Sequence, residues 1–337
     1  MKILYSAVMT SMQDIARRLN ISRSTVSLVL SGKSDGRVSE AVKKKVLQAA
    51  KEMDYHLNEL ARSLRVGSSN LISVIVTDIS NEFFAQMTFH IQEAAKKAGY
   101  LVLTINSNEN DQEFEQMARL LISKQVDGII AVPTPGGEDS LRMIIDQKVP
   151  LVTVDRFCEG VSADYVGVDN YEASKKAVSE LLSEGFNKIC MMRLDLDIPP
   201  LNERERGYID AMKAAGQQEH IAIHRIRFGE EMERDLLVPL DDVMATDAVF
   251  FSSHRVFTEA MKVVSKVGGV PQRQCVLCFD DVRPYVTGAT DIRYIEQPIA
   301  EIAQKSFDLL LAKIKGEAGT GRYIFPTRSI DRQSLLK

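Results

Sequence analysis

Residues 11–30 read SMQDIARRLNISRSTVSLVL, and the spacing of their apolar positions decides the fold of the first part of the chain. The first half predicts a helix with one apolar stripe, which Ser11 and Asp14 can cap. After a short break at Asn20, Ser22 can cap a second helix. The apolar faces of the two helices are Met12, Ile15, Ala16 and Leu19, then Val26, Val29 and Leu30. Two short helices with a tight turn between them are typical of a helix-turn-helix.

The residues that follow predict a third helix, which completes a small helical head. Ser39 can cap it, and its inner face is Val42, Val46, Ala49, Ala50 and Met53. The second helix opens with short hydrogen-bonding side chains and one arginine: Ser22, Arg23, Ser24, Thr25 and Ser27. A recognition helix needs such residues in its first turn, which meets base edges and phosphates in the major groove. Surface caps are the alternative, but the three-helix spacing and the local charge favour DNA binding.

Charge is unevenly distributed along the chain. The 337 residues carry a net charge of −4, yet residues 1–66 hold 12 Lys and Arg against 6 Asp and Glu, so the remainder is acidic. A basic head on an acidic body indicates different partners, and a polyanion suits the head. Apolar runs are far shorter than the ~20 residues that cross a bilayer, the N-terminus is a poor signal peptide, and the cysteines make no disulfide framework. We therefore expect a cytoplasmic protein of about two domains with no membrane partner.

Residues 58–67 predict a helix of barely two turns. Alone it would be marginal because helix nucleation is costly, so it needs its own copy in a dimer, or DNA, as a partner. The whole region carries a characteristic set of motifs: Met12–Ala16, Ser22–Ser27, Arg37–Ser39, Tyr55, Asn58, Ala61 and Leu64. Through these motifs, residues 10–67 resemble the DNA-binding head of the lactose/purine repressor family.

The resemblance implies how the head meets DNA. Arg23 and Ser24 would read bases in the major groove, and a hinge helix would enter the minor groove, where Leu64 wedges between base pairs and bends the duplex. The hinge residues expected on DNA are Asn58, Ala61, Arg62 and Leu64. Leu28 departs from the polar residue that many members carry, which leaves the operator sequence open. We expect a homodimer on a near-palindromic operator DNA.

From residue 68 onward, apolar strands alternate with amphipathic helices. This alternation indicates parallel sheets with right-handed crossovers, and the number of strands requires two lobes. The expected strands are Leu71–Val76, Tyr100–Ile105, Val126–Val132, Leu151–Val154, Lys188–Met192, Ile221–Ile226, Asp247–Phe251 and Cys275–Phe279. The expected helices are Phe83–Ala98, Phe114–Ser123, Ser140–Gln147, Glu203–Ala215, Val256–Val267 and Ile299–Lys315. The predicted fold class is therefore α/β: an all-α head and hinge helix, then a two-lobed α/β body.

This body resembles the periplasmic-binding-protein-like effector domain of the same family. The motifs are Asp127–Ile130, Val154–Arg156, Val166–Asn170, Arg204 before Gly207–Tyr208, Phe279–Asp281 and Glu296–Pro298. The resemblance implies crossings between the lobes near Asp169, Pro298 and Arg322. The expected division is a head (1–57), a hinge (58–67) and an effector-binding and dimerisation domain (68–337), with lobe one about 68–168 and 298–322 and lobe two about 169–297 and 323–337.

Polar or aromatic residues follow nearly every strand, which is where parallel sheets bind ligands. Asp155 and Arg156 sit where sugar-binding members place an acceptor and a donor, and Phe83 or Phe84 would stack on an apolar sugar face. A surface ion pair and lobe core are the respective alternatives. The expected effector-binding residues are Asn81, Phe83, Phe84, Thr134, Asp155, Arg156, Arg193, Arg204, Ser253, His254, Asp280 and Gln297.

The identity of the effector stays open between a sugar and a sugar acid or phosphosugar. Ser253–His254 replaces the usual Asn-Asp of the family, and the arginines of this set suit an acidic ligand. The interpretation is a transcriptional repressor whose operator affinity such an effector controls. A solute-binding protein is the alternative that the fused head and the lack of a signal peptide oppose. A nucleobase-responsive regulator of the same architecture is another.

An enzyme is the third class of function, and no motif favours it. Cys275 and Cys278 lie in an expected strand, where side chains three residues apart point to opposite faces and cannot hold one metal. The sequence has no Walker motif, no nucleophile elbow and no glycine-rich loop in the context of a dinucleotide site. We therefore predict no metal, no cofactor and no catalytic residue.

Overall fold

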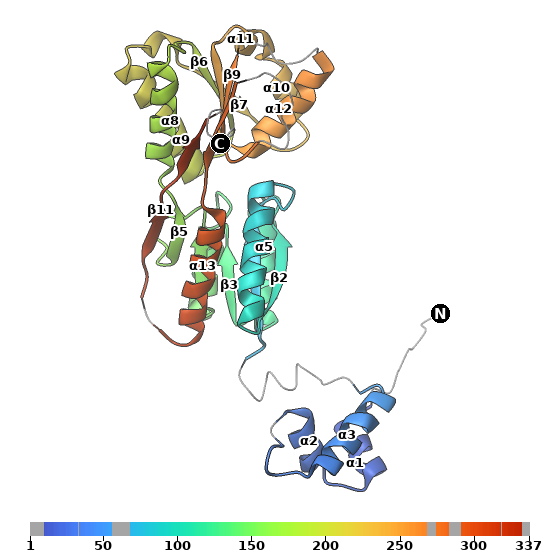
Figure 1. The fold of residues 1–337 in the computed structure, drawn as a ribbon. Helices are drawn as coiled ribbons and strands as arrows, with labels where there is room; N and C mark the ends of the chain where they lie inside the picture. The colour runs from blue at the N-terminus through green and yellow to red at the C-terminus, as the bar shows by residue number, and fades with distance from the viewer. Residues whose placement is uncertain are drawn as a thin grey trace. The chain divides into compact units, whose positions relative to one another are not determined.

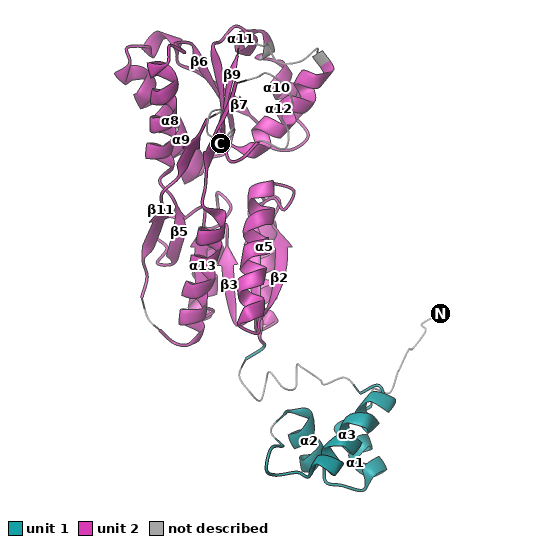
Figure 2. Ribbon diagram, in the orientation of Figure 1, with its two compact units in different colours: residues 1–69 teal, residues 70–337 magenta. Residues whose placement is uncertain are grey.

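The structure, a computed structural model, describes residues 10–32, 34–55, 68–267, 274–282, 291–317 and 319–331. Figure 1 shows the fold, and Figure 2 shows the division of the chain into two compact units, residues 1–69 and 70–337. Within the described ranges, no helix combines the length and the apolar character needed to cross a membrane.

The first unit is a head of three helices. They are α1 (Met12–Leu19), α2 (Arg23–Leu30) and α3 (Glu40–Glu52). The predicted capping box is present, because the Asp14 N–H donates to the Ser11 hydroxyl (3.3 Å) and the Ser11 N–H donates to the Asp14 carboxylate (2.9 Å). The apolar faces of the three helices meet around Ile15, Val26 and Val46, which are fully buried. The helix-turn-helix prediction is confirmed.

Lobe one of the body is built on a parallel sheet, whose described strands run in the order β11-β5-β4-β3-β1-β2. These strands are β1 (Leu71–Val76), β2 (Leu101–Asn106), β3 (Gly128–Ala131), β4 (Leu151–Val154), β5 (Asp164–Val168) and β11 (Arg322–Phe325). The helices are α5 (Glu82–Lys97), α6 (Asp111–Ser123), α7 (Glu138–Asp146) and α13 (Ile299–Ile314). Helices α5 and α13 pack together on one face, as Figure 1 shows, and α6 and α7 bury Phe114 and Leu141 on the other.

Lobe two repeats this plan with a sheet in the order β12-β10-β9-β8-β6-β7, in which only β12 runs antiparallel to its described neighbour. The strands are β6 (Ile189–Leu194), β7 (Ala222–Ile226), β8 (Ala248–Phe251), β9 (Cys275–Phe279), β10 (Asp291–Glu296) and β12 (Arg328–Ile330). The helices are α8 (Asn170–Ser183), α9 (Pro199–Ala214), α10 (Met232–Leu237), α11 (Leu240–Met244), α12 (His254–Val267) and a 3-10 turn (Gln218–His220). The two-lobed α/β prediction is confirmed.

The sequence pattern left several short elements unassigned, and also β5, α8 and β10. Strand β5 is only five residues long and contains Gly167, and β10 mixes charged residues with its apolar ones, so neither gives a continuous apolar run. The chain crosses between the lobes after β5 and again after β10, at the expected Asp169 and Pro298. Strand β11 belongs to the first sheet, so the third crossing lies between Phe325 and Arg328, slightly beyond the expected position near Arg322.

Helix α9 is packed tightly in lobe two, which holds in place the side chains that it presents to the space between the lobes. Gly207 lets α9 approach α8 so closely that a Cβ at this position would collide with the backbone carbonyl of Tyr171. The buried Tyr208 hydroxyl donates to the Ile189 carbonyl (2.7 Å) and accepts from the Ala222 N–H (3.1 Å). The Gly-Tyr pair therefore ties α9 to both α8 and the sheet.

Candidate functional site

The head presents a polar row along the start of α2. The Ser22 hydroxyl caps this helix by accepting from the Thr25 N–H (3.1 Å), and it lies 2.7 Å from the Ser24 hydroxyl oxygen. Arg23 and Ser24 are exposed, whereas Thr25 and Ser27 are partly buried. This row has the exposure that base and phosphate contacts require. The other expected DNA-binding residues, Asn58, Ala61, Arg62 and Leu64, lie outside the described residues.

A cavity lies in the body where the carboxyl ends of both sheets meet. Its polar lining is Asp78, Asn81, Glu109, Asp155, Arg156, Arg204, Ser253, Arg255, Asp280 and Gln297. Its apolar lining is Phe83, Phe84, Leu194, Ile198, Pro200, Leu201 and Phe228. The structure thus brings nine of the twelve expected effector-binding residues to one cavity.

Two carboxylates occupy equivalent positions in the two lobes. Asp155 follows β4 and Asp280 follows β9, and both have left-handed backbone, with φ of 64° and 78°. Each N–H donates to the next strand, from Asp155 to the Val166 carbonyl and from Asp280 to the Ile295 carbonyl, both at 3.0 Å. Left-handed backbone is costly for a residue with a Cβ and clusters at functional sites. The same local bend therefore aims one acidic side chain from each lobe into the cavity.

On the lobe-one side, Asp155 lies beside a buried arginine. The Arg156 Nε is 3.6 Å from the Asp155 carboxylate, and the Arg156 terminal nitrogens donate to both carboxylate oxygens of Glu109, each at 2.7 Å. Burial raises the pKa of Asp155, while the guanidinium groups of Arg156 and Arg204 oppose this shift. Asp155 has no described hydrogen bond from another side chain, so its oxygens are suited to accept hydroxyls of a ligand.

On the lobe-two side, Arg204 and Asp280 are both buried. Arg204 donates from Nε to the Asn170 side chain (2.8 Å) and from a terminal nitrogen to the Ser252 carbonyl (2.7 Å). Its guanidinium carbon lies 3.4 Å from the centre of the Phe279 ring. Burial raises the pKa of Asp280 to about 6, against the opposing charge of Arg204 and the hydrogen bond from Gln297.

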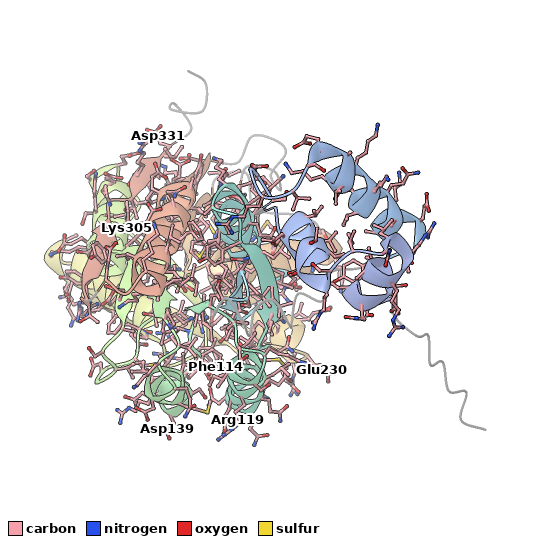
Figure 3. The ribbon with its side chains drawn as sticks, turned by 90° about the horizontal axis from the view of Figure 1, so that it is seen from below. Phe114, Arg119, Asp139, Glu230, Lys305 and Asp331 are labelled. Carbon is pink, nitrogen blue, oxygen red and sulfur yellow. The ribbon has the colours of Figure 1, made fainter. Side chains whose placement is uncertain are left out.

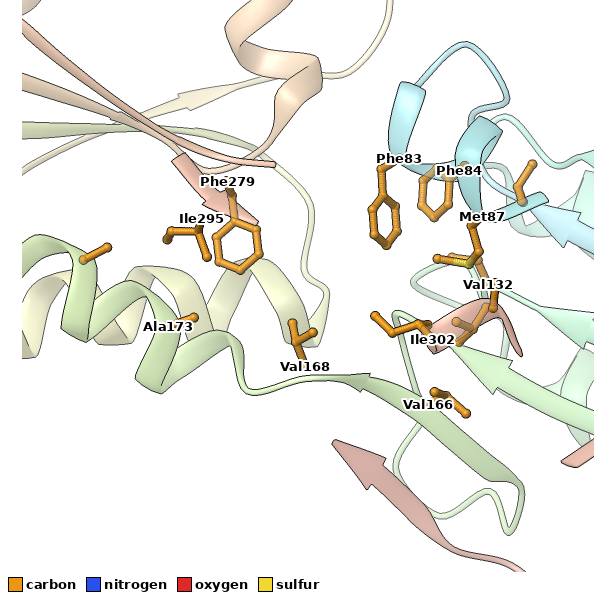
Figure 4. Close-up of a cluster of buried hydrophobic side chains, with 14 of the residues drawn as sticks. Phe83, Phe84, Met87, Val132, Val166, Val168, Ala173, Phe279, Ile295 and Ile302 are labelled. Carbon is orange, nitrogen blue, oxygen red and sulfur yellow. The ribbon is translucent and has the colours of Figure 1, made fainter. Parts of the chain in front are cut away.

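The apolar walls of the cavity come from both lobes. Phe83 and Phe84 begin α5 and pack edge to face, with ring centres 5.2 Å apart. Asn81 caps this helix by accepting from the Phe83 N–H (3.1 Å), which fixes the position of the first ring. In Figure 4 these rings lie on the lobe-one side and Phe279 on the lobe-two side of one hydrophobic cluster. Rings beside charged groups match a ligand with both hydroxyls and an apolar face.

The structure does not bring the other three expected residues to this cavity. Thr134 lines a neighbouring cavity that Arg156 also borders. The Arg193 side chain is buried within lobe two, where it donates to the Leu196 carbonyl (2.6 Å) and pairs with Glu205. His254 is buried at the start of α12, and burial lowers its pKa. The end of a strand therefore proved too coarse a guide at these positions.

Sequence reasoning missed Glu109 and the contacts that join the two lobes beside the cavity. Arg255 of lobe two donates to the Ser80 hydroxyl of lobe one (3.1 Å), and its Nε lies 3.7 Å from the Asp78 carboxylate. His254 Nε2 lies 3.5 Å from the Glu82 carboxylate. The polar run from Asp78 to Glu82 and His254 were noted in the sequence, but Arg255 and these pairings between the lobes were not.

The two cysteines of the Cys-x-x-Cys motif lie on opposite faces of β9. Cys275 packs in the hydrophobic cluster that faces α8 and α9, whereas Cys278 packs in the cluster on the α12 side. Burial raises the pKa of both thiols, to about 12 for Cys275. Within the described ranges, no group of His, Cys, Asp and Glu side chains is arranged to hold a metal ion.

Comparison with known proteins places both units. Residues 11–58 match the family of bacterial regulatory proteins, lacI family, and residues 72–318 match the periplasmic binding protein domain. The chain is 28% identical over 97% of its length to the ribose operon repressor of Halalkalibacterium halodurans, of which it covers 97%. A putative ribose operon repressor from Burkholderia thailandensis is 26% identical, with a TM-score of 0.68 over 77% of this chain and 98% of that one. The lac repressor dimer bound to operator and an anti-inducer shares the fold, with a TM-score of 0.80 and 18% identity over 97% of this chain and 99% of that one.

Proposed function

The chain belongs to the lacI family of DNA-binding bacterial regulators, and we propose that a small sugar or sugar acid bound between its two lobes controls its affinity for operator DNA. The relatives are transcriptional regulators, and we infer that this chain binds its ligand without turnover. A regulator of this class acts where operator DNA is accessible, so we place it in the cytoplasm.

The observation that carries this proposal is the pair of carboxylates, Asp155 and Asp280, that face one cavity from opposite lobes. A carboxylate accepts hydrogen bonds from two neighbouring hydroxyls, and a guanidinium donates to hydroxyl or ring oxygens. Arg156 and Arg204 supply the guanidinium groups, and Phe83 and Phe84 supply apolar surface. A polyhydroxylated ring offers groups that match all three kinds of side chain.

A homodimer on operator DNA is the second part of the proposal, and exposed apolar residues on lobe one support it. Phe89 on α5 and Leu101 and Leu103 on the edge strand β2 are 58%, 75% and 40% exposed. Apolar residues gathered at a free sheet edge are typical of an interface. A two-fold dimer presents two heads to the two halves of a near-palindromic operator. Effector and operator then change each other's affinity by the same factor, typically about 1–3 kcal/mol.

The test begins with an operator selected from random-sequence DNA by the full chain. Sugars, sugar acids, phosphosugars and nucleobases are screened by thermal shift, because a ligand that binds the folded body raises its melting temperature. Each hit is titrated into the complex with labelled operator at several salt concentrations. We expect a sugar or sugar acid to change operator affinity about 5-fold or more, and Arg23→Ala to weaken operator binding by about 1–3 kcal/mol.

Three outcomes would contradict the proposal. A hit that binds the body but leaves operator affinity unchanged would favour a solute-binding protein. A hit that is chemically converted would favour an enzyme. Nucleobases as the only hits would move the chain to the nucleobase-responsive class.

A further inference from the structure

Glu109 is a buried carboxylate in the cavity wall that sugar recognition alone does not explain. Its side chain is 7% exposed and belongs to the loop after β2. Asn108 and Glu109 both have left-handed backbone, with φ of 54° and 55°. Two successive residues of this kind are costly without glycine and persist only where the surroundings hold them.

The loop around Glu109 is held on both sides. The Ser107 N–H donates to the Val76 carbonyl (2.9 Å), and the Asn108 side chain donates to the Glu113 carboxylate (2.7 Å). Asn110 then caps α6 by accepting from the Glu113 N–H (3.0 Å). Glu109 is therefore fixed against the cavity rather than free to turn into solvent.

The only described partner of the Glu109 carboxylate is Arg156. Its two oxygens accept from the two terminal nitrogens of Arg156 at 2.7 Å, and the Arg156 side chain is 5% exposed. Such a paired geometry is the strongest that a guanidinium forms with a carboxylate. It occupies the same terminal nitrogens that would grip the carboxylate of a sugar acid or the phosphate of a phosphosugar.

The other two arginines that line the cavity also have protein partners. Arg204 donates to Asn170 and to the Ser252 carbonyl, and Arg255 lies against Asp78 and Ser80. The lining contains four carboxylates against these three guanidinium groups, so its formal charge is −1. With Glu109 neutral, that charge would be zero, and the terminal nitrogens of Arg156 would lose their carboxylate partner, leaving Arg156 only the ion pair of its Nε with Asp155 (3.6 Å).

We propose that Glu109 is a specificity-determining residue that makes this cavity select neutral sugars and reject sugar acids and sugar phosphates. It acts as a positioning residue through Arg156, whose charge it neutralises and whose orientation it fixes. An anionic ligand would have to displace a buried carboxylate from Arg156 or lie beside it, and like charges at such distances are repelled. This inference rests on the proposed function and names its ligand class.

The experiment measures selectivity as well as affinity. The full chain and its Glu109→Gln variant are titrated by calorimetry with D-ribose, D-ribonate and D-ribose 5-phosphate, and with glucose, gluconate and glucose 6-phosphate. The parent is expected to bind a neutral sugar and neither of its anionic partners. Glu109→Gln is expected to gain roughly tenfold or more for an anion relative to the neutral sugar.

Two further variants separate specificity from structure. Glu109→Asp keeps the charge and is expected to restore the selectivity for the neutral sugar. Glu115→Gln removes the same charge from an exposed pair with Arg119, which points outward from α6 in Figure 3, and is expected to behave like the parent. A merely structural role of Glu109 would weaken neutral and anionic ligands alike.

The outcomes are distinguishable. A parent that binds an anionic ligand as tightly as the neutral sugar overturns the inference whether or not the variant folds, and leaves the proposed function intact. A folded Glu109→Gln variant with unchanged selectivity also overturns it. A parent that binds no sugar of any class overturns this inference and the proposed function together.

Discussion

The two lobes place an aspartate at the same structural position but surround it differently. Asp155 and Asp280 share the left-handed backbone and the N–H bond to the next strand. Asp155 lies beside Arg156, whose terminal nitrogens are taken by Glu109. Asp280 accepts from Gln297 (2.7 Å) and feels the charge of Arg204. The sheet topology therefore sets where the carboxylates lie, and the loops set what each carboxylate meets.

This difference teaches how one fold builds two unlike halves of a binding site. Lobe one contributes three charged side chains in a row, which are Glu109, Arg156 and Asp155. The constrained loop after β2 holds Glu109 in place. Lobe two contributes a carboxylate whose pKa burial raises to about 6, so ionising it costs more free energy in the folded protein than in the unfolded chain. We expect the first half to decide which ligand binds and the second to couple binding to stability.

The largest effect is expected from removing the lobe-one carboxylate. Asp155→Ala deletes an acceptor for two hydroxyls, each hydrogen bond to a charged group contributing about 1.5–3 kcal/mol, so sugar affinity should fall by roughly 100-fold or more. Arg156 keeps its partner Glu109, so the fold should survive. Operator binding without effector should be unchanged, and the response to effector should be lost. Calorimetry and operator titration measure these quantities.

The control for this variant is Asp139→Ala, on the outer side of α7 (Figure 3). It removes the same charge and should leave sugar affinity and the operator response as they are. An Asp155→Ala variant that responds normally would show that the ligand contacts assigned to lobe one are misplaced.

The next effect concerns the lobe-two carboxylate and pH. The pKa of Asp280 rises from 3.8 to about 6 on folding, so the folded state holds its proton more tightly than the unfolded state. The free energy of unfolding should therefore fall as pH rises from about 4 to 6, by up to about 3 kcal/mol. Asp280→Asn removes this loss, so it should melt at a higher temperature than the parent at pH 7 and lose the advantage below pH 4.

Melting curves of the parent and Asp280→Asn between pH 4 and pH 7 measure this effect without ligand. Asp155→Asn is the comparison across the lobes, and its raised pKa predicts a shift of the same sign. The same Asp280→Asn change should weaken sugar binding, because it removes a carboxylate acceptor from the cavity. A variant that is more stable but binds less tightly is the usual trade-off at a functional site. Melting temperatures of the parent and Asp280→Asn that differ by the same amount at every pH would contradict the raised pKa of Asp280.

The sequence predicts which residues lie at the ends of the strands better than it predicts which of their side chains reach the cavity and pair with one another. Parallel strands meet at one edge, so Asp155 and Asp280 could be grouped from their places in the pattern. Arg204 lies within α9 and was expected at the site only from the family resemblance. Arg193 also stands near the end of a strand, but its neighbours Leu194 and Leu201 line the cavity while its own side chain lies within lobe two. Strand alternation alone does not show which face meets the ligand.

The residues that escaped prediction depend on backbone conformation or on contacts between distant segments. Glu109 reaches Arg156 only because two successive residues adopt a left-handed backbone, for which the sequence gives no periodic signal. The pairing of Arg255 with Asp78 joins segments of the two lobes that lie far apart in the chain. Such pairings follow from the packing of the lobes, which local patterns do not encode.

The smallest effect is expected from the contacts that join the lobes. Arg255→Ala removes the hydrogen bond to Ser80 and the long ion pair with Asp78, in which the Arg255 side chain is still 27% exposed. A pair that solvent screens this much stabilises a closed arrangement by about 0.5–1 kcal/mol, so sugar affinity should fall only two- to five-fold. Calorimetry at low and high salt measures this, with Arg119→Ala as the control. A loss of sugar affinity as large as that of Asp155→Ala would mean that Arg255 contacts the ligand directly. Residues that bind the ligand and residues that only join the lobes could then no longer be told apart at this position.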